Sequence, residues 1–173
     1  WLAPPAAEDC LFVNAYRRGG GPARRVPVMI WVHGGGFCTG AGATGWTEGS
    51  RLAAREDVLV ITLNYRLGPL GFASDGREGG AHGLWDVITA VAFARAALVE
   101  GLGGDLDAVT LFGESSGGVA VCALSASPAA AGLFRRAIIQ SGPCVVDAPR
   151  GWGPGAADEG VAATRRFLDA LGA

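Results

Sequence analysis

The chain contains no lysine: all 14 of its positively charged residues are arginine, against 16 acidic residues, and its formal net charge is −2. The arginines are scattered along the sequence and form no cluster. Proteins that bind nucleic acid or anionic membranes by electrostatic attraction carry concentrated positive charge. The charge pattern therefore argues against nucleic acid as a partner.

Cysteine is also scarce. The residues Cys10, Cys38, Cys122 and Cys144 are widely spaced and form no C-x-x-C pair of the kind that binds zinc. We therefore expect no metal and no cofactor. Four cysteines would permit two disulfide bonds, but nothing marks the chain as secreted: it has no N-glycosylation sequon and no visible signal peptide, which a chain beginning at Trp1 could not show.

Long apolar runs are absent as well. Half of the residues are hydrophobic and the mean hydropathy is +0.31. No apolar run approaches the roughly 18 residues that a membrane-spanning helix needs. No membrane span is therefore expected, and the 173 residues are enough for one domain with a substantial core.

Strand-like and helix-like patterns alternate along the chain. Strands are expected over 11–16, 26–32, 58–63, 109–112 and 137–140, and the near-continuous apolar run 26–32 is typical of a strand covered on both faces. Helices are expected over 51–55, 84–99, 116–124 and 156–171, with a long loop over 64–83. This alternation predicts an α/β fold with a doubly wound, mostly parallel sheet, which binds ligands beyond the carboxyl ends of its strands.

The pentapeptide Gly113-Glu114-Ser115-Ser116-Gly117 lies between an expected strand and an expected helix. A strand that turns sharply into a helix pushes the central side chain out of the backbone, and glycine on either side avoids a clash. This arrangement is the nucleophile elbow, which presents the Ser115 hydroxyl at a helix N-terminus for attack on an ester carbonyl. In a chain with 29 glycines, the pattern alone is only suggestive.

A second glycine-rich motif, His33-Gly34-Gly35-Gly36, follows the apolar run 26–32. Acyl transfer creates a negative oxygen, which backbone N–H groups stabilise only where the chain comes close, as glycine permits. Alone, the motif could be a surface turn; beside the elbow it predicts an oxyanion hole. Residues 40–45 match G-x-G-x-x-G, but no convincing helix follows, so we interpret them as a loop and not as a nucleotide site.

Several stretches in a fixed order give the chain a family resemblance. They are EDCLFVNAY at 8–16, HGGGF at 33–37, NYRLGPLGF at 64–72, the segment 103–118 that ends in GESSGG, and FRRAIIQSG at 134–142. Together they resemble the type B carboxylesterase family, which includes the cholinesterases, within the α/β-hydrolase superfamily. The resemblance implies a serine carboxylic-ester hydrolase that acts through an acyl-enzyme on a small-molecule ester.

The resemblance also implies roles for individual residues. Ser115 is the expected nucleophile, and the N–H groups of Gly35, Gly36 and Ser116 are the expected oxyanion hole. Ser116 stands where the family usually has alanine. Glu114 corresponds to a residue that shapes the electrostatics of the site, although it could equally be an ordinary acid at a helix N-terminus.

Other residues are expected to support the site. Ser141 corresponds to a buried family serine that hydrogen-bonds near the catalytic histidine, the alternative being a turn residue after a strand. His33 is expected to organise the glycine loop and not to act as a base, and Asn64 and Arg66 to hold the floor of the site. In secreted relatives the cysteine equivalent to Cys10 pairs with one further upstream, which this chain does not have.

The acid and histidine of a catalytic triad are missing from these residues. In the superfamily they follow the serine, whereas His33 and His82 both precede Ser115. Residues 1–173 therefore resemble the N-terminal part of one esterase domain, truncated after the half that holds the elbow, with an unpaired sheet edge. The isolated chain is expected to be inactive. A truncated product without function and a cholinesterase-like, non-catalytic interaction domain remain the alternatives.

Overall fold

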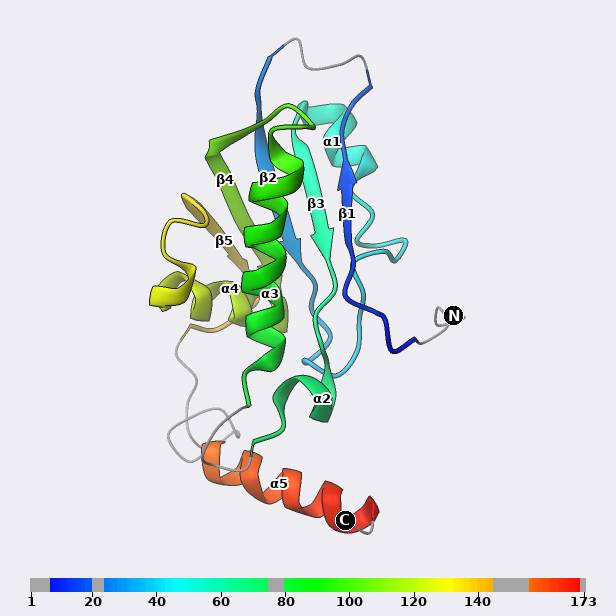
Figure 1. Ribbon diagram of the computed structural model, residues 1–173, viewed down its shortest axis with the longest axis vertical. Helices are drawn as coiled ribbons and strands as arrows, with labels where there is room; N and C mark the ends of the chain where they lie inside the picture. Colours follow the sequence, from blue (N-terminus) through cyan, green and yellow to red (C-terminus); the bar gives the residue numbers. More distant parts are fainter. Residues whose placement is uncertain (1–6, 20–23, 75–79, 145–155, 172–173) are drawn as a thin grey trace.

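The computed structural model describes residues 7–19, 24–74, 80–144 and 156–171 (Figure 1). Its strands are β1 (Val13–Tyr16), β2 (Val26–Val32), β3 (Leu59–Leu63), β4 (Gly104–Glu114) and β5 (Arg136–Gln140). Its helices are α1 (Ser50–Glu56), α2 (Gly68–Phe72), α3 (His82–Phe93) with its π-helical continuation η1 (Ala94–Val99), α4 (Ser116–Ala126), the 3₁₀ turn η2 (Pro128–Ala130) and α5 (Ala156–Leu171). The expected alternation of strands and helices is confirmed.

The strands form a five-stranded sheet in the order β1-β3-β2-β4-β5. Strands β3, β2, β4 and β5 pair in parallel, and only β1 is antiparallel, against β3. The mostly parallel sheet predicted from the sequence is therefore confirmed. In β3 all five residues are buried, as its continuous apolar sequence predicts for a strand covered on both faces.

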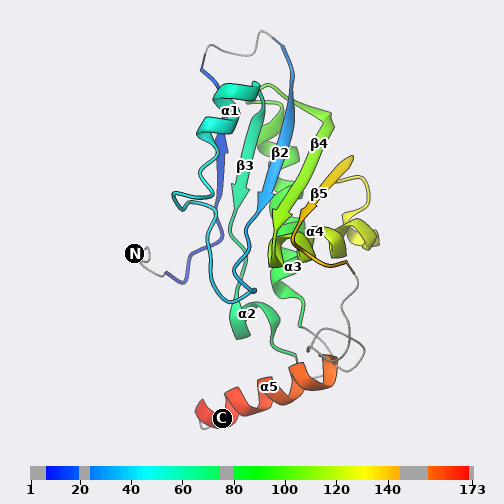
Figure 2. The same ribbon diagram turned by 180° about the vertical axis from the view of Figure 1, so that it is seen from behind.

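Helices cover both faces of the sheet, which makes it doubly wound. The larger core cluster joins Val28 and Ile61 of the sheet to Val87 and Val91 of α3 and Val121 of α4. A smaller cluster on the opposite face joins α1 to the alternate residues of the strands. Figure 1 shows α3 in front of the sheet, and in Figure 2, seen from behind, the sheet lies in front of α3.

This winding creates a switch point between β2 and β4. The chain leaves β2 toward α1 on one face, and it leaves the neighbouring β4 toward α4 on the other face. In open α/β sheets, ligands bind at the carboxyl ends of strands where such connections diverge. The glycine loop after β2 and the elbow after β4 both lie at this point.

The segment 64–83 was expected to be an uninterrupted loop, and this prediction is wrong at α2. Pro69 lies in the first turn of this short helix, where a fixed φ and a missing N–H favour helix initiation. The N–H of Ala73 closes the helix by donating to the carbonyl of Pro69 at 2.9 Å. The helix is too short to show a periodic apolar pattern, so the sequence gives little signal for it.

The helix formed by α3 and η1 departs from another expectation. Over its 18 residues, His82–Val99, the mean hydropathy is 1.3, so by length and composition it could cross a membrane. The expectation that no apolar stretch approaches this length is therefore wrong. Core helices pass the same test, and Val87, Val91, Ala94 and Val99 are buried against the sheet. The helix is thus weak support for a membrane span.

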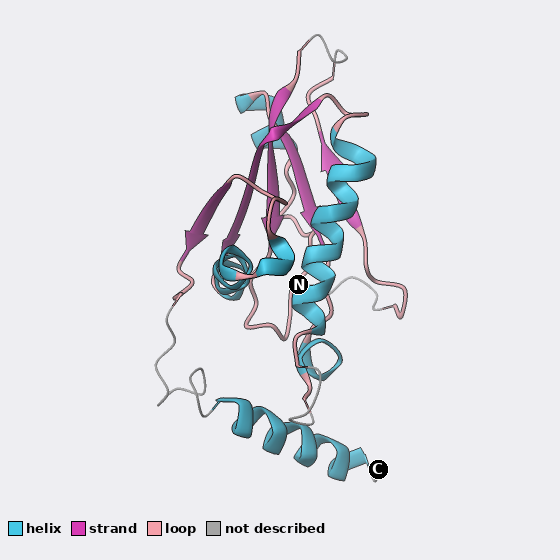
Figure 3. Cartoon of the chain, turned by 60° about the vertical axis from the view of Figure 1, so that its left-hand side comes forward, coloured by secondary structure: helices cyan, strands magenta, loops and turns pink. Residues whose placement is uncertain are grey.

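Strand β5 lies at one edge of the sheet, and all five of its residues are exposed. Ile138 and Ile139 are among its exposed residues. Figure 3 shows the four parallel strands pointing toward α5, which lies beyond their carboxyl ends. The unpaired edge expected from the sequence is present in the described residues.

Candidate active site

Ser115 occupies the sharp turn between β4 and α4. Its backbone has φ +53° and ψ −127°, a region that residues other than glycine rarely adopt. The turn is held on both sides, because the Ser115 N–H donates to the carbonyl of Gln140 in β5 at 2.8 Å and the Val119 N–H donates to the Ser115 carbonyl at 3.0 Å. Such strain costs roughly 1–3 kcal/mol and typically persists at functional sites.

The glycines on either side of the elbow are required by close backbone contacts. A Cβ on Gly113 would lie 2.8 Å from the carbonyl oxygen of Val32, and a Cβ on Gly117 would lie 2.1 Å from the same oxygen. Helix α4 therefore begins directly against the end of β2. The steric reason for the G-x-S-x-G spacing, inferred from the sequence, is confirmed.

The loop after β2 runs beside this turn. A Cβ on Gly34 would lie 3.1 Å from the Cβ of Ser115 and 2.8 Å from the carbonyl oxygen of Glu114. Gly35 and Gly36 have φ of +116° and +62°, which glycine adopts without strain. The structure thus brings the predicted nucleophile and the predicted oxyanion loop into contact.

Backbone donors gather where the loop meets the elbow. The Gly35 carbonyl accepts from the N–H groups of Cys38 and Thr39, at 3.1 and 3.0 Å. By contrast, within the described residues the N–H groups of Gly35, Gly36 and Ser116 donate to no acceptor. The N-terminal end of the α4 dipole adds a partial positive charge next to Ser115. A negative oxygen would meet a favourable potential here.

The side chain of Ser116 joins the two motifs. It is 4 % exposed, and its Oγ accepts a hydrogen bond from the Phe37 N–H at 3.2 Å. It also lies close enough to the Tyr65 hydroxyl to lower the pKa of that group slightly. The hydroxyl that this chain has in place of the family's usual alanine therefore ties the end of the glycine loop to the first residue of α4.

His33 is buried below the loop, only 2 % exposed. Its Nδ1 lies 2.8 Å from the Gly34 carbonyl, which can only accept, so Nδ1 carries the proton. Its ring stacks on Tyr65 with centroids 4.4 Å apart, and the Tyr65 hydroxyl donates to the His33 carbonyl at 2.7 Å. Its Nε2 makes no hydrogen bond with any described residue, including Ser115. The geometry is that of a loop organiser.

Burial shifts the acidity of this pair. Burial lowers the pKa of His33 below its ordinary value of 6.5, and the hydrogen bond to Gly34 offsets this only in part. Burial also raises the pKa of Tyr65 to about 12, against a smaller opposing effect of the Ser116 side chain. Both side chains are therefore neutral near pH 7.

We expect the His33 imidazole to titrate below pH 6.5. Because the folded chain then binds this proton less readily than the unfolded chain, the free energy of unfolding falls as the pH drops below 6.5. The chain has only two histidines, so ¹H–¹³C NMR resolves both rings, and the His82→Gln variant assigns them. A His33 signal that titrates at or above pH 6.5 would contradict this picture.

The supporting residues differ in their placement. Glu114 is exposed at the end of β4, with its Oε2 3.0 Å from the position of a Cβ on Gly34, so its carboxylate lies beside the glycine loop. Ser141 has φ +52° and is exposed in the described residues, where it follows β5 at the edge of the sheet. Its expected place near a catalytic histidine stays a prediction.

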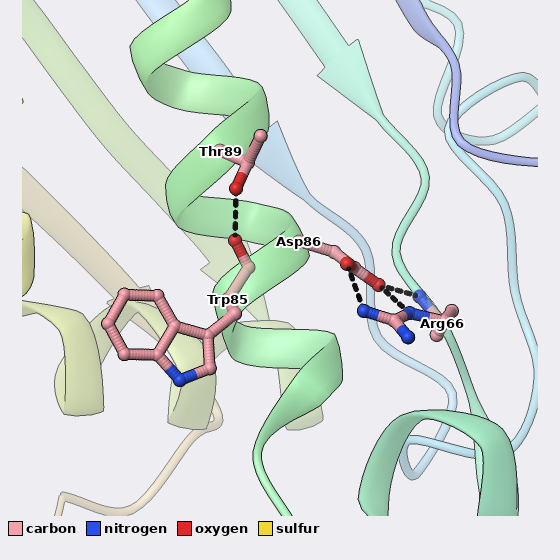
Figure 4. Close-up of polar contacts among 4 residues, drawn as sticks. All are labelled: Arg66, Trp85, Asp86 and Thr89. Atoms are coloured by element: carbon pink, nitrogen blue, oxygen red, sulfur yellow. Dashed lines mark hydrogen bonds and ion pairs between the residues drawn. The ribbon is translucent and has the colours of Figure 1, made fainter.

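Asn64 and Arg66 hold loops together, as expected. Asn64 accepts from the Gly42 N–H and donates to the Cys10 carbonyl, both at 2.8 Å. Arg66 forms a two-pronged ion pair with Asp86 of α3 at 2.7 and 2.8 Å, drawn in Figure 4. Burial would raise the pKa of Asp86, but hydrogen bonds from the Arg66 side chain and backbone, and its charge, bring that pKa below its usual value.

Two features of this region were not predicted. Tyr65 stacks on His33 and donates to its carbonyl, and only its place in the NYRLGPLGF stretch could have suggested a role. A disulfide bond joins Cys122 to Cys144, while Cys10 and Cys38 are free thiols. Within the described ranges, no group of three or more histidine, cysteine, aspartate or glutamate side chains is placed to hold a metal ion.

Comparison with known proteins yields consistent matches. A sequence profile described as "Carboxylesterase family" matches residues 3–151. The chain is 47 % identical over 143 residues to the para-nitrobenzyl esterase of Bacillus subtilis (strain 168), covering 80 % of this chain and 29 % of that protein. It is 50 % identical over 139 residues to carboxylesterase 3 of Homo sapiens, and the match covers 79 % of this chain and 24 % of that protein.

Solved structures give the same result. A thermophilic PNB esterase superposes with a TM-score of 0.83 at 41 % identity, covering 98 % of this chain and 34 % of that one. The acetylcholinesterase of Gallus gallus is 42 % identical to this chain over 170 residues, and the match covers 96 % of this chain and 21 % of that protein. The chain thus spans about a fifth to a third of the length of these relatives.

Proposed function

The chain belongs to the carboxylesterase family, and on that premise we propose that it carries the acylating part of a serine ester hydrolase. The observation that carries the proposal is the convergence at the β2–β4 switch point. There the strained turn at Ser115 meets a loop whose Gly35 and Gly36 N–H groups have no acceptor among the described residues.

The proposed reaction begins with attack of the Ser115 Oγ on the carbonyl carbon of a small-molecule carboxylic ester. A base takes the hydroxyl proton, and the carbonyl oxygen becomes negative. The N–H groups of Gly35, Gly36 and Ser116 stabilise this oxygen, each such donor being worth about 10²–10³ in rate. The alcohol then leaves with a proton, and water hydrolyses the acyl group from Ser115.

Neither of the two histidines is placed to act as this base. The buried Nε2 of His33 makes no hydrogen bond to Ser115, and His82 begins α3 and is exposed. We therefore propose that the isolated chain is inactive and that Ser115 becomes reactive only when the rest of an esterase domain is present. A non-catalytic interaction role is less well supported, because the strained turn at Ser115 lies beside backbone N–H groups that have no acceptor among the described residues.

A chimera tests this proposal. Residues 3–151 replace the matching segment of the Bacillus subtilis para-nitrobenzyl esterase, which then contributes its own remaining residues. The chimera is expected to hydrolyse p-nitrophenyl acetate, whereas the isolated chain is expected not to. Circular dichroism and thermal melting, compared with the parent esterase, establish that the chimera is folded. A folded chimera without hydrolysis would contradict the proposal.

A further inference from the structure

The disulfide between Cys122 and Cys144 links two parts of the chain that flank the elbow. Cys122 lies in α4, the helix that begins immediately after Ser115, and Cys144 follows β5. Their Cα atoms are 5.5 Å apart, and 22 residues separate them in sequence. Cys144 is exposed and Cys122 is half-buried, so the bond is within reach of reagents in solvent.

The same two parts also touch at the backbone. The Ser115 N–H donates to the Gln140 carbonyl at the end of β5. A Cβ on Gly142 would lie 2.6 Å from the Gly118 carbonyl carbon and 2.6 Å from the Val119 nitrogen. The segment from Gln140 to Cys144 therefore runs along the first turns of α4, with the disulfide at its far end.

Strand β5 lies at the edge of the described sheet. Among the described residues it pairs with β4 and contacts α4, all five of its residues are exposed, and no strand lies on its other side. Edge segments with few buried contacts open with the smallest free energies in a fold. A covalent link at the end of such a segment restricts this opening because it limits the conformations of the open state.

We propose that the Cys122–Cys144 disulfide is a redox-sensitive tether that holds the segment after β5 against α4 and so fixes the backbone at Ser115. When the disulfide is oxidised, it keeps the Gln140 carbonyl in hydrogen-bonding contact with the Ser115 N–H and maintains the strained turn. When the disulfide is reduced, the segment after β5 opens and the Ser115 N–H loses its acceptor. The consequence for catalysis rests on the proposed function; the tether itself does not.

The switching step is thiol–disulfide exchange with a dithiol reductant. A thiolate of the reductant attacks the accessible sulfur of Cys144, which forms a mixed disulfide and releases the Cys122 thiolate. The second thiolate of the reductant then attacks the mixed disulfide and releases the Cys144 thiolate. The reductant becomes a cyclic disulfide, two electrons pass to the protein, and both cysteines end as thiols.

Peptide mapping tests whether the bond forms. The four cysteines lie on separate tryptic peptides, 1–17, 26–51, 96–135 and 137–150, because the chain has no lysine and trypsin cuts only after arginine. After alkylation without reduction, peptides 96–135 and 137–150 are expected to remain linked, with Cys10 and Cys38 alkylated. Any other linkage, or alkylation of all four cysteines, would overturn the proposal.

Hydrogen exchange tests the tether. With dithiothreitol, amide exchange over 115–119 and 137–144 is expected to rise about tenfold or more, while β2 and β3 stay unchanged. The Cys122→Ser variant without reductant should match the reduced chain, and the Cys10→Ser/Cys38→Ser variant, which keeps the disulfide, should match the wild type.

Two results would overturn the proposal that the disulfide tethers this segment. One is exchange that does not change on reduction. The other is fast amide exchange over the whole chain, in either the oxidised or the reduced state. That result would show that the disulfide stabilises the whole fold and not this segment alone, or that β5 is not formed. Neither readout depends on ester hydrolysis, so the failure of the tether and the failure of the proposed esterase function are distinguishable.

Discussion

Replacing Ser115 with alanine in the chimera is expected to lower kcat/KM for p-nitrophenyl acetate about 10⁴- to 10⁶-fold, the loss typical of removing a catalytic nucleophile. The reason is chemical, because Ser115 holds the strained position of the elbow, whereas the neighbouring Ser116 is buried and its Oγ accepts a hydrogen bond from Phe37. Alanine fits the same space, so the fold should be retained. Steady-state kinetics and thermal melting of the variant check both expectations.

The matched control for this variant is Ser125→Ala. Ser125 lies in the same helix, is exposed, and donates its hydroxyl to the Val121 carbonyl at 2.8 Å, away from the elbow. Its replacement is expected to leave kcat/KM within about twofold, as for a surface substitution. Activity that survives Ser115→Ala, or falls equally in both variants, would contradict the assignment of the nucleophile.

Replacing Gly117 with alanine is expected to destabilise the fold by about 3 kcal/mol or more, the upper range for overpacking. A Cβ at this position would lie 2.1 Å from the Val32 carbonyl oxygen and 2.7 Å from the His33 carbonyl oxygen. Both are backbone atoms and cannot rotate away. Either α4 moves off β2 or the strand end deforms, and the melting temperature of the chimera should fall by about 3 °C or more, because the shift per kcal/mol is small in a protein of this size.

The matched control is Gly45→Ala, in the loop between β2 and α1. A Cβ on Gly45 would meet no atom within 4 Å, and its φ is not in the left-handed region. This variant is expected to melt within about 1 °C of the unmodified chimera, since an unstrained surface change has little effect. Equal melting temperatures for Gly117→Ala and Gly45→Ala would show that the close approach of α4 to β2 is not a constraint.

The sequence predicted the strands where apolar residues run without interruption. It placed β2 and β3 correctly, but it predicted β4 only over 109–112, whereas the strand begins at Gly104. The first part of β4 contains Asp105 and Asp107, which hide the strand pattern. Its pairing with β2 also shifts register between Val26 and Val28. Such an irregularity depends on the neighbouring strand and has no local signal.

The site shows the same division between local and long-range information. The elbow and the glycine loop were predicted because their backbone geometry demands glycine at fixed spacing, which is visible in the sequence. The contacts of Tyr65 with His33 were missed because they join segments far apart in the chain. The Cys122–Cys144 pairing was missed for the same reason.

The most direct test of the central claim is to locate a fluorophosphonate adduct on the chimera by tandem mass spectrometry. The tryptic peptide 96–135 contains the adjacent serines Ser115 and Ser116, and fragmentation between them distinguishes the two hydroxyls. Our account predicts one adduct, on Ser115, and none on the isolated chain, which lacks a placed base. An adduct on Ser116, or labelling of the isolated chain that Ser115→Ala removes, would contradict it.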